Sequence, residues 1–254
     1  MISKNKIKYI RSLHEKKFRE QENLFLVEGI KMINELLESD FRVSEIFATQ
    51  EAFGQLKLPE SRLKPEIIST DELNKISALK HPQGVLAIIA MNENSSIPDI
   101  SEKLSLALDF IQDPGNMGTI IRICDWFGIE TIFCSMNCVD VYNPKTIQAT
   151  MGAIFRIKIH YVELSEFLKN QSKENGLPVY GTFLDGENIY NEALSQKGII
   201  IMGNEGNGIS KEIEPFVSQK LFIPSYPRTR VSSESLNVST ATAIICAEFR
   251  RRSL

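Results

Sequence analysis

Residues 109–128 read DFIQDPGNMGTIIRICDWFG, and this stretch decides the fold of the larger part of the chain. An apolar strand predicted over 104–110 runs into a polar, glycine-bearing turn, and a helix is predicted over 117–127. Ligands in open α/β sheets bind outside the carboxyl ends of strands, so this turn is predicted to face a site. Asn116 stands just before the helix and is a candidate cap. Arg122 lies among isoleucines, which favours either an anionic partner at a cleft or a structural salt bridge.

A second segment, IIIMGNEGNGIS (199–210), is an apolar strand followed by three glycines. Glycines at a strand end let a ligand approach the backbone closely. The spacing matches neither the dinucleotide fingerprint nor a Walker A loop. Glu205 is a candidate hydrogen-bond acceptor within the loop, although a plain turn explains the same residues equally well.

A third segment begins with LFIPS (221–225), where a strand is predicted to end, and continues into ESLNVSTATAIICAEF (234–249). A terminal helix is predicted over about 236–251, with Ser235 as its N-cap. The small residues of this helix would allow close packing against a neighbour. A helix cap alone also explains the pair of Ser235 and Asn237.

The alternation of strands and helices predicts the architecture. Further apolar strands are predicted over 131–134 and 178–183, which indicates a mostly parallel sheet covered on both faces. The first ninety residues show a separate alternation of strands (24–29, 43–48, 85–90) with helices, one of them capped by Thr70, and predict a small α/β unit. The polar stretch 91–99 between the two is predicted to be a linker.

The net charge of −3 excludes a global basic field, but the charge is unevenly placed. The first twenty residues carry seven lysines and arginines against two glutamates, and they predict an amphipathic basic helix. This helix is either a solvated surface or a face that contacts phosphates. A nucleic-acid surface on this protein would have to be a local patch of this kind.

Four cysteines occur without paired CxxC units, which indicates reduced core thiols, and the three histidines are scattered, so no metal site is predicted. The start of the chain lacks the apolar stretch of a signal peptide. No apolar run approaches the ~20 residues that span a bilayer. The sequence therefore predicts a soluble, cytoplasmic protein without a membrane partner.

The order and spacing of the three segments together are much more specific than any one alone. Asn-x5-Arg after a strand, then GNEGxG, then IP…SLNVS resembles the three signature motifs of the SpoU (TrmH-type) RNA ribose 2′-O-methyltransferases of the SPOUT superfamily. The resemblance covers about 104–252, and the intervening 146–159 is similar to the family's segment between its first two motifs. The amino-terminal FLVEG and HPQGVLA stretches resemble a substrate-binding domain similar to ribosomal protein L-thirty-e. The resemblance implies an RNA-binding domain over 1–92, a linker over 93–102 and a methyltransferase domain over 103–254.

The family resemblance implies an α/β fold with a deep trefoil knot, S-adenosylmethionine as cofactor, ribosomal or transfer RNA as partner, and a homodimer formed through the knot and terminal helix. Matched to the family motifs, the implied catalytic residues are Asn116, Arg122, Glu205, Ser235 and Asn237. The implied cofactor contacts are Thr182, Leu184, Gly203, Asn204, Gly208, Ile223 and Leu236. Since arginine does not lose its proton in proteins, Arg122 is expected to hold the target phosphate or ribose and polarise the hydroxyl. Asn116 and Glu205 are then expected to orient Arg122, while Ser235 and Asn237 shape the knot and the ribose site.

The third motif departs from the family pattern. The stretch YPRTRVSS (226–233) is longer than usual and contains no glycine, which affects the expected geometry of the cofactor loop. Arg228 and Arg230 within it either contact RNA phosphates or belong to a solvated loop.

Two other functions compete with methyl transfer. One is a non-catalytic RNA-binding or ribosome-associated protein on the same fold, which loss of the motif residues would favour. The other is a nucleotide-dependent metabolic enzyme, which the missing GxGxxG and Walker A lysine oppose.

Overall fold

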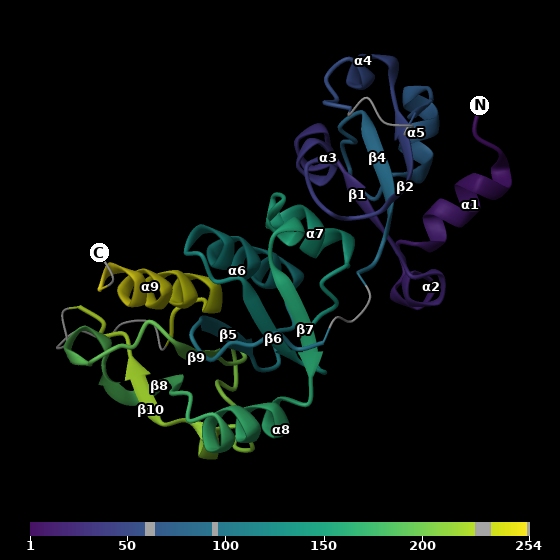
Figure 1. The fold of residues 1–254 in the computed structure, drawn as a ribbon. Coiled ribbons are helices and arrows are strands. Elements are labelled where there is room, and N and C mark those ends of the chain that lie inside the picture. Colours follow the sequence, from purple (N-terminus) through teal and green to yellow (C-terminus); the bar gives the residue numbers. More distant parts are fainter. Residues whose placement is uncertain (59–63, 93–95, 227–234, 253–254) are drawn as a thin grey trace. The chain divides into compact units, whose positions relative to one another are not determined.

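The computed structural model describes residues 1–58, 64–92, 96–226 and 235–252. The chain forms two compact units (Figure 1). The first contains Met1–Ser95 together with Asp140–Arg156, and the second contains Ser96–Val139 together with Ile157–Leu254. The predicted linker falls partly on residues 93–95, which lie outside the described residues.

The second unit is built on a six-stranded sheet in the order β10-β8-β9-β5-β6-β7. Every neighbouring pair in it is parallel. The prediction of a mixed α/β fold with a mostly parallel sheet is therefore confirmed. The strands are β5 Leu104–Leu108, β6 Thr131–Ser135, β7 Lys158–Val162, β8 Val179–Asn188, β9 Gly198–Met202 and β10 Gln219–Phe222.

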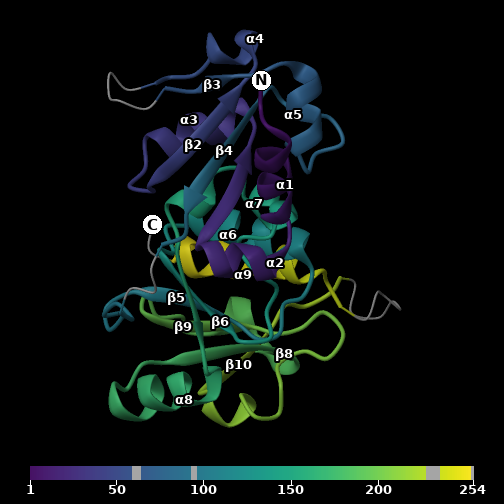
Figure 2. The same cartoon turned by 90° about the vertical axis from the view of Figure 1, so that its right-hand side faces the viewer.

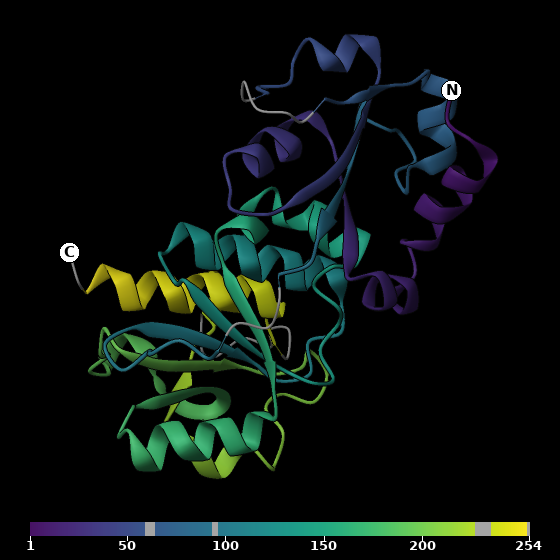
Figure 3. The ribbon, with the colours of Figure 1, turned by 45° about the vertical axis from the view of Figure 1, so that its right-hand side comes forward.

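Helices cover both faces of this sheet, as parallel strands require. On one face lie α6 (Pro114–Trp126) and α9 (Val238–Arg251), which pack against each other. On the other lies α8 (Leu164–Lys169), extended by a π-helical turn over Asn170–Glu174 (Figure 3). Phe167 of α8 stacks on Phe133 of β6 with ring centroids 4.1 Å apart, and this contact belongs to a buried apolar core. Short 3-10 turns over Ile189–Asn191 and Glu214–Phe216 complete the unit.

The strand order places a topological switch point between β9 and β5. From β5 the chain proceeds outward through β6 and β7, and it later returns to pair β9 with the opposite edge of β5. Loops that leave neighbouring strands in opposite directions open a crevice at their carboxyl ends, and ligands bind there in open α/β sheets. Both the 109–116 turn and the 203–210 loop leave the sheet at this point.

The first unit has a smaller sheet in the order β1-β4-β2-β3 (Figure 2). Its pairs β1–β4 and β4–β2 are antiparallel, and β2–β3 is parallel. A buried core joins this sheet to the first and fifth helices through residues such as Ile10, Leu73 and Leu86. The elements are α1 Lys4–Ser12, α2 Lys16–Glu22, β1 Leu24–Glu28, α3 Ile30–Leu37, β2 Val43–Ala48, α4 Gln50–Phe53, β3 Glu66–Ile67, α5 Thr70–Ile76 and β4 Val85–Ala90.

The segment Asp140–Arg156 packs into the first unit although its sequence lies between the first and second of the three signature segments. It contains α7 (Pro144–Thr150) and a 3-10 turn over Ala153–Phe155. The Gln148 side chain donates to the backbone oxygen of Glu28 over 3.0 Å. The rings of Tyr142 and Phe25 lie 4.5 Å apart. The segment is therefore a structural part of the amino-terminal unit.

Three predicted helix caps are wrong by one to three residues. Ser69 caps α5 in a capping box with Glu72, so Thr70 is the first helical residue. Asp113 caps α6, which leaves Asn116 inside the first turn. Asn237, rather than Ser235, caps α9. In each case a neighbouring side chain with the same capping ability takes the position.

The predicted basic helix at the amino terminus is two helices, and Arg19 does not belong to its charged surface. Arg19 is 1% exposed. Its guanidinium forms an ion pair of 2.5 Å with Asp140 and donates to the backbone oxygens of Leu13 and His14. The exposed positive charge of α1 and α2 comes from the other residues, among them Lys4, Lys8, Arg11, Lys16 and Lys17.

All four cysteines are buried and free, in agreement with the prediction of core thiols. No helix among the described residues is long and apolar enough to cross a membrane. Within the same part of the chain, histidine, cysteine, aspartate and glutamate side chains form no group of three or more that could hold a metal ion.

Candidate active site

Three predicted catalytic residues meet at the switch point and are joined by their side chains. Asn116 donates its amide hydrogen to Glu205 Oε1 over 2.6 Å. Asn237 donates to Asn116 Oδ1 over 3.0 Å, while its own Oδ1 caps α9. The three come from the start of α6, the loop after β9 and the start of α9. The amide of Asn116 is free for these bonds because Asp113 supplies the helix cap.

Further bonds fix the 203–210 loop to the end of β5. Asn204 donates through its side chain to the backbone oxygen of Phe110 over 2.9 Å. The backbone N–H of Ser210 donates to Asp109 Oδ2 over 2.7 Å. Within the loop, Asn204 and Gly208 form an isolated antiparallel bridge, and Asn204 Oδ1 accepts from two backbone N–H groups. The loop is thus a preorganised turn rather than a free connection.

Gly203 is required at its position by close backbone packing. A Cβ atom there would lie 2.2 Å from the backbone carbon of Gly208 and 2.3 Å from the nitrogen of Ile209. Gly208 has a φ of +69°, a conformation that glycine adopts without strain. Gly206, by contrast, would bring a Cβ no closer than 3.6 Å to any atom. Gly203 and Gly208 are therefore needed for the conformation of the loop.

Arg122 lies six residues beyond Asn116 on α6, and its side chain is exposed. It forms no ion pair or hydrogen bond with the described residues, so a structural salt bridge does not account for it there. The structure also shows no bond from Asn116 or Glu205 that would orient its guanidinium. Ser235 is exposed just before α9. Neither residue is joined to the group formed by Asn116, Glu205 and Asn237.

The side chains predicted to contact the cofactor differ in how far they are exposed. Thr182 is half-buried on β8, and its hydroxyl donates to the backbone oxygen of Ile201 over 3.4 Å. Leu184 and Leu236 are large apolar residues that remain 70% and 47% exposed. Ile223 is half-buried directly after β10. The exposed leucine side chains offer apolar surface to a ligand. Arg228 and Arg230 lie outside the described residues.

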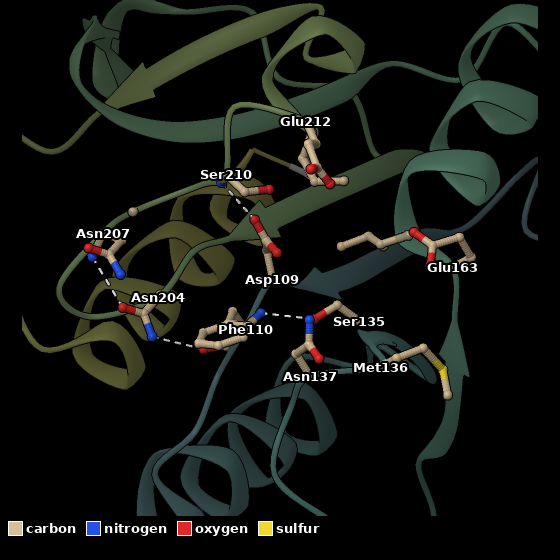
Figure 4. A pocket seen from close by; sticks show the side chains of 13 residues that line it. Asp109, Phe110, Ser135, Met136, Asn137, Glu163, Asn204, Asn207, Ser210 and Glu212 are labelled. Atoms are coloured by element: carbon tan, nitrogen blue, oxygen red, sulfur yellow. Dashed lines mark hydrogen bonds between the residues drawn. The ribbon is translucent and has the colours of Figure 1, made fainter.

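A cavity of about 340 Å³ opens beside the loop, and most of its lining was not predicted (Figure 4). It contains Asn204 and Gly208 from the predicted set, together with Asp109, Ser135 and Glu163. These last three share a sequence signal: each stands at or just after the carboxyl end of a predicted or observed strand. A polar residue closing an apolar strand, as in LALD (106–109), is the pattern that would have found them.

Cys138 connects the turn after β6 to the end of β5. Its Sγ accepts from the backbone N–H of Ile111 and donates to the backbone oxygen of Leu108, both over 3.3 Å. A hydrogen bond from Cys134, assisted by Ser135 and nearby backbone groups, lowers the pKa of Cys138 to about 7. The thiol is only 6% exposed, so its role in the structure is to hold the turn in place.

A parallel sheet with a glycine loop and a carboxylate–amide network at its switch point defines an α/β protein that binds its ligand at the strand ends. The model of the SpoU rRNA methylase family matches residues 103–247, and that of an MRM3-like substrate-binding domain matches residues 4–87. The chain belongs to the SpoU rRNA methylase family.

Individual relatives agree with this assignment. The chain is 31% identical to the 23S rRNA (guanosine(2553)-2′-O)-methyltransferase RlmP of Bacillus subtilis, over 96% of both chains. It is 38% identical to a solved structure assigned to the TrmH family from Porphyromonas gingivalis, with a TM-score of 0.89 and 99% of both chains covered. An rRNA methyltransferase from Sinorhizobium meliloti, solved with S-adenosylmethionine bound, is 26% identical with a TM-score of 0.83, covering 100% of this chain and 98% of its own.

Proposed function

We propose that the protein transfers a methyl group from S-adenosylmethionine to a ribose 2′-hydroxyl of RNA, with ribosomal RNA as the substrate class. The observation that carries this proposal is the side-chain network of Asn116, Glu205 and Asn237 at the switch point. It brings the three signature segments to one place, although they are far apart in the sequence. The relatives named as RNA 2′-O-methyltransferases support the same reaction.

The chain's own residues have to position the ribose and help its proton leave. S-adenosylmethionine, when bound, supplies a methyl group that is already reactive, so alignment is the larger part of the task. Arg122, exposed and without a partner in the described part of the chain, is assigned to the target phosphate or ribose, where its fixed charge polarises the hydroxyl. Asn116 and Glu205 fix the neighbouring loop. Asn237 caps α9, and Ser235 lies two residues before it.

The cofactor is assigned to the surface formed by the ends of β8 and β9 and the residues after β10. At Gly208 nothing lies within 4 Å of the position of a Cβ, so a ligand can approach its backbone closely, while Gly203 packs against Gly208 and keeps the turn tight. Leu184, Ile223 and Leu236 offer apolar surface for a nucleoside. Thr182 and Asn204 hold the adjoining backbone. These assignments follow the family motifs residue by residue.

We assign RNA recognition to residues 1–92, methyl transfer to 103–254 and the connection to 93–102. The exposed lysines of α1 and α2 support the first assignment. We further propose a trefoil knot in the carboxy-terminal part and a cytoplasmic homodimer formed through the knot and α9. Trp126, which is 84% exposed at the end of α6, supports an interface on this face, because α6 packs beside α9.

Two measurements test the function. First, S-adenosylmethionine should raise the melting temperature of the purified protein, because a ligand that binds only the folded state stabilises it. Second, 2′-O-methylation should be mapped across total RNA from cells lacking the protein and from their parent. We expect one ribosomal nucleotide to lose its methyl group. If the cofactor binds and every methyl group persists, the protein is a non-catalytic RNA-binding member of the family.

A further inference from the structure

The backbone between β5 and α6 bends at Phe110, at the start of the turn that leads to Asn116. Phe110 has a φ of +61°, a left-handed conformation that is unfavourable for a bulky side chain. Among the described residues, the other non-glycine positions of this kind are Asn23 and Met151, and each ends a helix. Phe110 instead follows a buried strand, and such a conformation persists only where the surrounding structure holds it.

Both backbone polar groups of Phe110 are held by side chains from other parts of the sheet (Figure 4). Its N–H donates to Ser135 Oγ over 3.0 Å, and Ser135 is the last residue of β6. Its oxygen accepts from the side chain of Asn204 over 2.9 Å. The left-handed residue is therefore fixed between the end of β6 and the loop after β9.

The next residue, Ile111, is held by the same part of the chain. Its N–H donates to Cys138 Sγ over 3.3 Å, and its oxygen accepts from the backbone N–H of Val139 over 2.8 Å. Residues 135–139, here called the β6 turn, thus supply three of the four partners of this bend. The β6 turn lies outside the three signature segments.

Ser135 also belongs to a chain of hydrogen bonds within the β6 turn. Its Oγ lies 3.5 Å from Cys138 Sγ, which in turn donates to the backbone oxygen of Leu108 over 3.3 Å. A hydroxyl proton directed at the sulfur completes a chain from the Phe110 N–H to the Leu108 oxygen, in which each group donates once. Alanine at position 135 would remove the acceptor of the Phe110 N–H and break this chain.

The bend held by Ser135 connects to both sides of the proposed active site. On one side Asp109 accepts the backbone N–H of Ser210, which belongs to the loop after β9. On the other side the chain continues to Asp113, which caps α6, and to Asn116, which bonds to Glu205. A change in the backbone at Phe110 would therefore shift the start of α6 relative to that loop. Small displacements of aligned groups slow a reaction that depends on alignment.

We propose that Ser135 is a positioning residue for methyl transfer, because it holds Phe110 in the left-handed conformation that sets the start of α6 against the loop after β9. This inference rests on the proposed function, and it adds to that function a residue outside the signature segments.

The test measures the single-turnover rate of methyl transfer by the full-length protein to an RNA fragment containing the mapped nucleotide, at saturating RNA and S-adenosylmethionine. Ser135→Ala should lower this rate roughly three- to tenfold, as for the loss of one hydrogen bond, and should change the S-adenosylmethionine dissociation constant by less. Ser135→Thr keeps the hydroxyl and should restore most of the rate. Ser135→Cys, a weaker acceptor of similar size, should lie between the two and extends the series if Ser135→Ala does not fold.

A second substitution at Phe110 separates positioning from a general loss of packing. Glycine adopts the left-handed conformation without strain, so the Ser135 hydroxyl should matter less in the Phe110→Gly background. There Ser135→Ala should lower the rate by less than about twofold, a non-additive result expected of residues that act through one contact. Because both proteins in this comparison lack the phenyl ring, its own contribution cancels.

Ser218→Ala is the matched control. The Ser218 hydroxyl accepts from the Val179 N–H and donates to the Val179 oxygen, both over 2.9 Å. Val179 begins β8, so these bonds lie at the opposite end of the parallel strands from the proposed active site. Ser218→Ala should lower the melting temperature about as much as Ser135→Ala and leave the single-turnover rate unchanged.

Several results would overturn the inference and leave methyl transfer standing. They are a folded Ser135→Ala protein with the wild-type rate, equal slowing by Ser135→Ala in both Phe110 backgrounds, or equal slowing by Ser218→Ala. Cofactor binding weakened as much as the rate would also overturn it, in favour of a role for Ser135 in holding S-adenosylmethionine. A wild-type protein that methylates no ribose overturns the proposed function together with this inference.

Discussion

The side-chain nitrogen of Asn116 lies 2.6 Å from Glu205 Oε1, although 89 residues separate the two in the sequence. The same amide accepts a hydrogen bond from Asn237, so its donor and acceptor ends are each assigned to one partner. An aspartate at this position could keep the bond from Asn237 but would face Glu205 with a like charge. Asparagine is therefore the residue type that satisfies both neighbours at once.

Substitutions at Asn116 and Glu205, made singly and together, test the hydrogen bond between these two side chains. Asn116→Asp should lower the free energy of unfolding by about 1–3 kcal/mol, because it removes a donor and adds a repulsive charge. Glu205→Gln should be milder, since its amide oxygen still accepts. The double variant restores a donor opposite an acceptor, and a double-mutant cycle from denaturant unfolding should give a favourable coupling of about 0.5–3 kcal/mol. Additive effects of the two substitutions would show that the bond does not form in solution.

Two glycines in the loop after β9 should differ in their response to alanine. Gly203→Ala places a Cβ 2.2 Å from the backbone of Gly208, so the loop has to shift. We expect a loss of about 1–3 kcal/mol in stability and weaker S-adenosylmethionine binding by isothermal titration calorimetry. Gly206→Ala meets nothing closer than 3.6 Å and serves as the control, with both quantities near those of the wild type. Equal behaviour of the two variants would refute the assigned role of Gly203.

Removal of Arg19 should destabilise the amino-terminal unit strongly. Its guanidinium is buried and paired with Asp140, so Arg19→Ala leaves a carboxylate with few remaining partners and should cost about 3–5 kcal/mol. Lys16→Ala, which removes an exposed ion pair with Glu20, should change stability by less than about 1 kcal/mol. Hydrogen exchange of the β1 and β4 amides can measure both. Similar protection in the two variants would contradict a stabilising role for the buried pair.

The ion pairs of Glu248 should make the stability of the protein sensitive to acid. Hydrogen bonds from Arg251, assisted by Arg252, lower the pKa of this 5% exposed carboxyl from 4.5 to about 2. A lowered folded-state pKa means that the ion pairs stabilise the protein above about pH 4.5 and that this contribution is lost as the pH falls toward 2. The melting temperature of Glu248→Gln should therefore lie below that of the wild type at neutral pH, and the gap should close on acidification. A gap independent of pH would contradict the assigned pairing.

The sequence predicted the second unit well because its elements carry strong local signals. Buried strands such as β5 and β9 are continuous apolar runs, and the residues at their carboxyl ends identify the site. Helix caps were less predictable. Asp113 and Asn116 are both good caps, and only the distant Glu205 and Asn237 decide that Asn116 serves the site instead.

Long-range polar contacts account for the remaining differences. The charge pattern of the first twenty residues groups Arg19 with the exposed basic residues. Its partner Asp140 is 121 positions away, so the local sequence does not reveal the buried ion pair. The cavity carboxylates were missed for a related reason. Asp109 and Glu163 follow different strands, and only the pairing of β5, β6 and β7 in one sheet brings them together.

We propose that Arg122, which lies on the same helix α6 as Asn116, acts on the ribose during methyl transfer. The most direct measurement is the single-turnover rate of methyl transfer to RNA by Arg122→Ala at saturating S-adenosylmethionine, with the cofactor dissociation constant measured in parallel. We expect a rate lower by roughly 100-fold or more, as for the loss of one preorganised electrostatic group, with the dissociation constant unchanged. A near-normal rate with intact cofactor binding would contradict it.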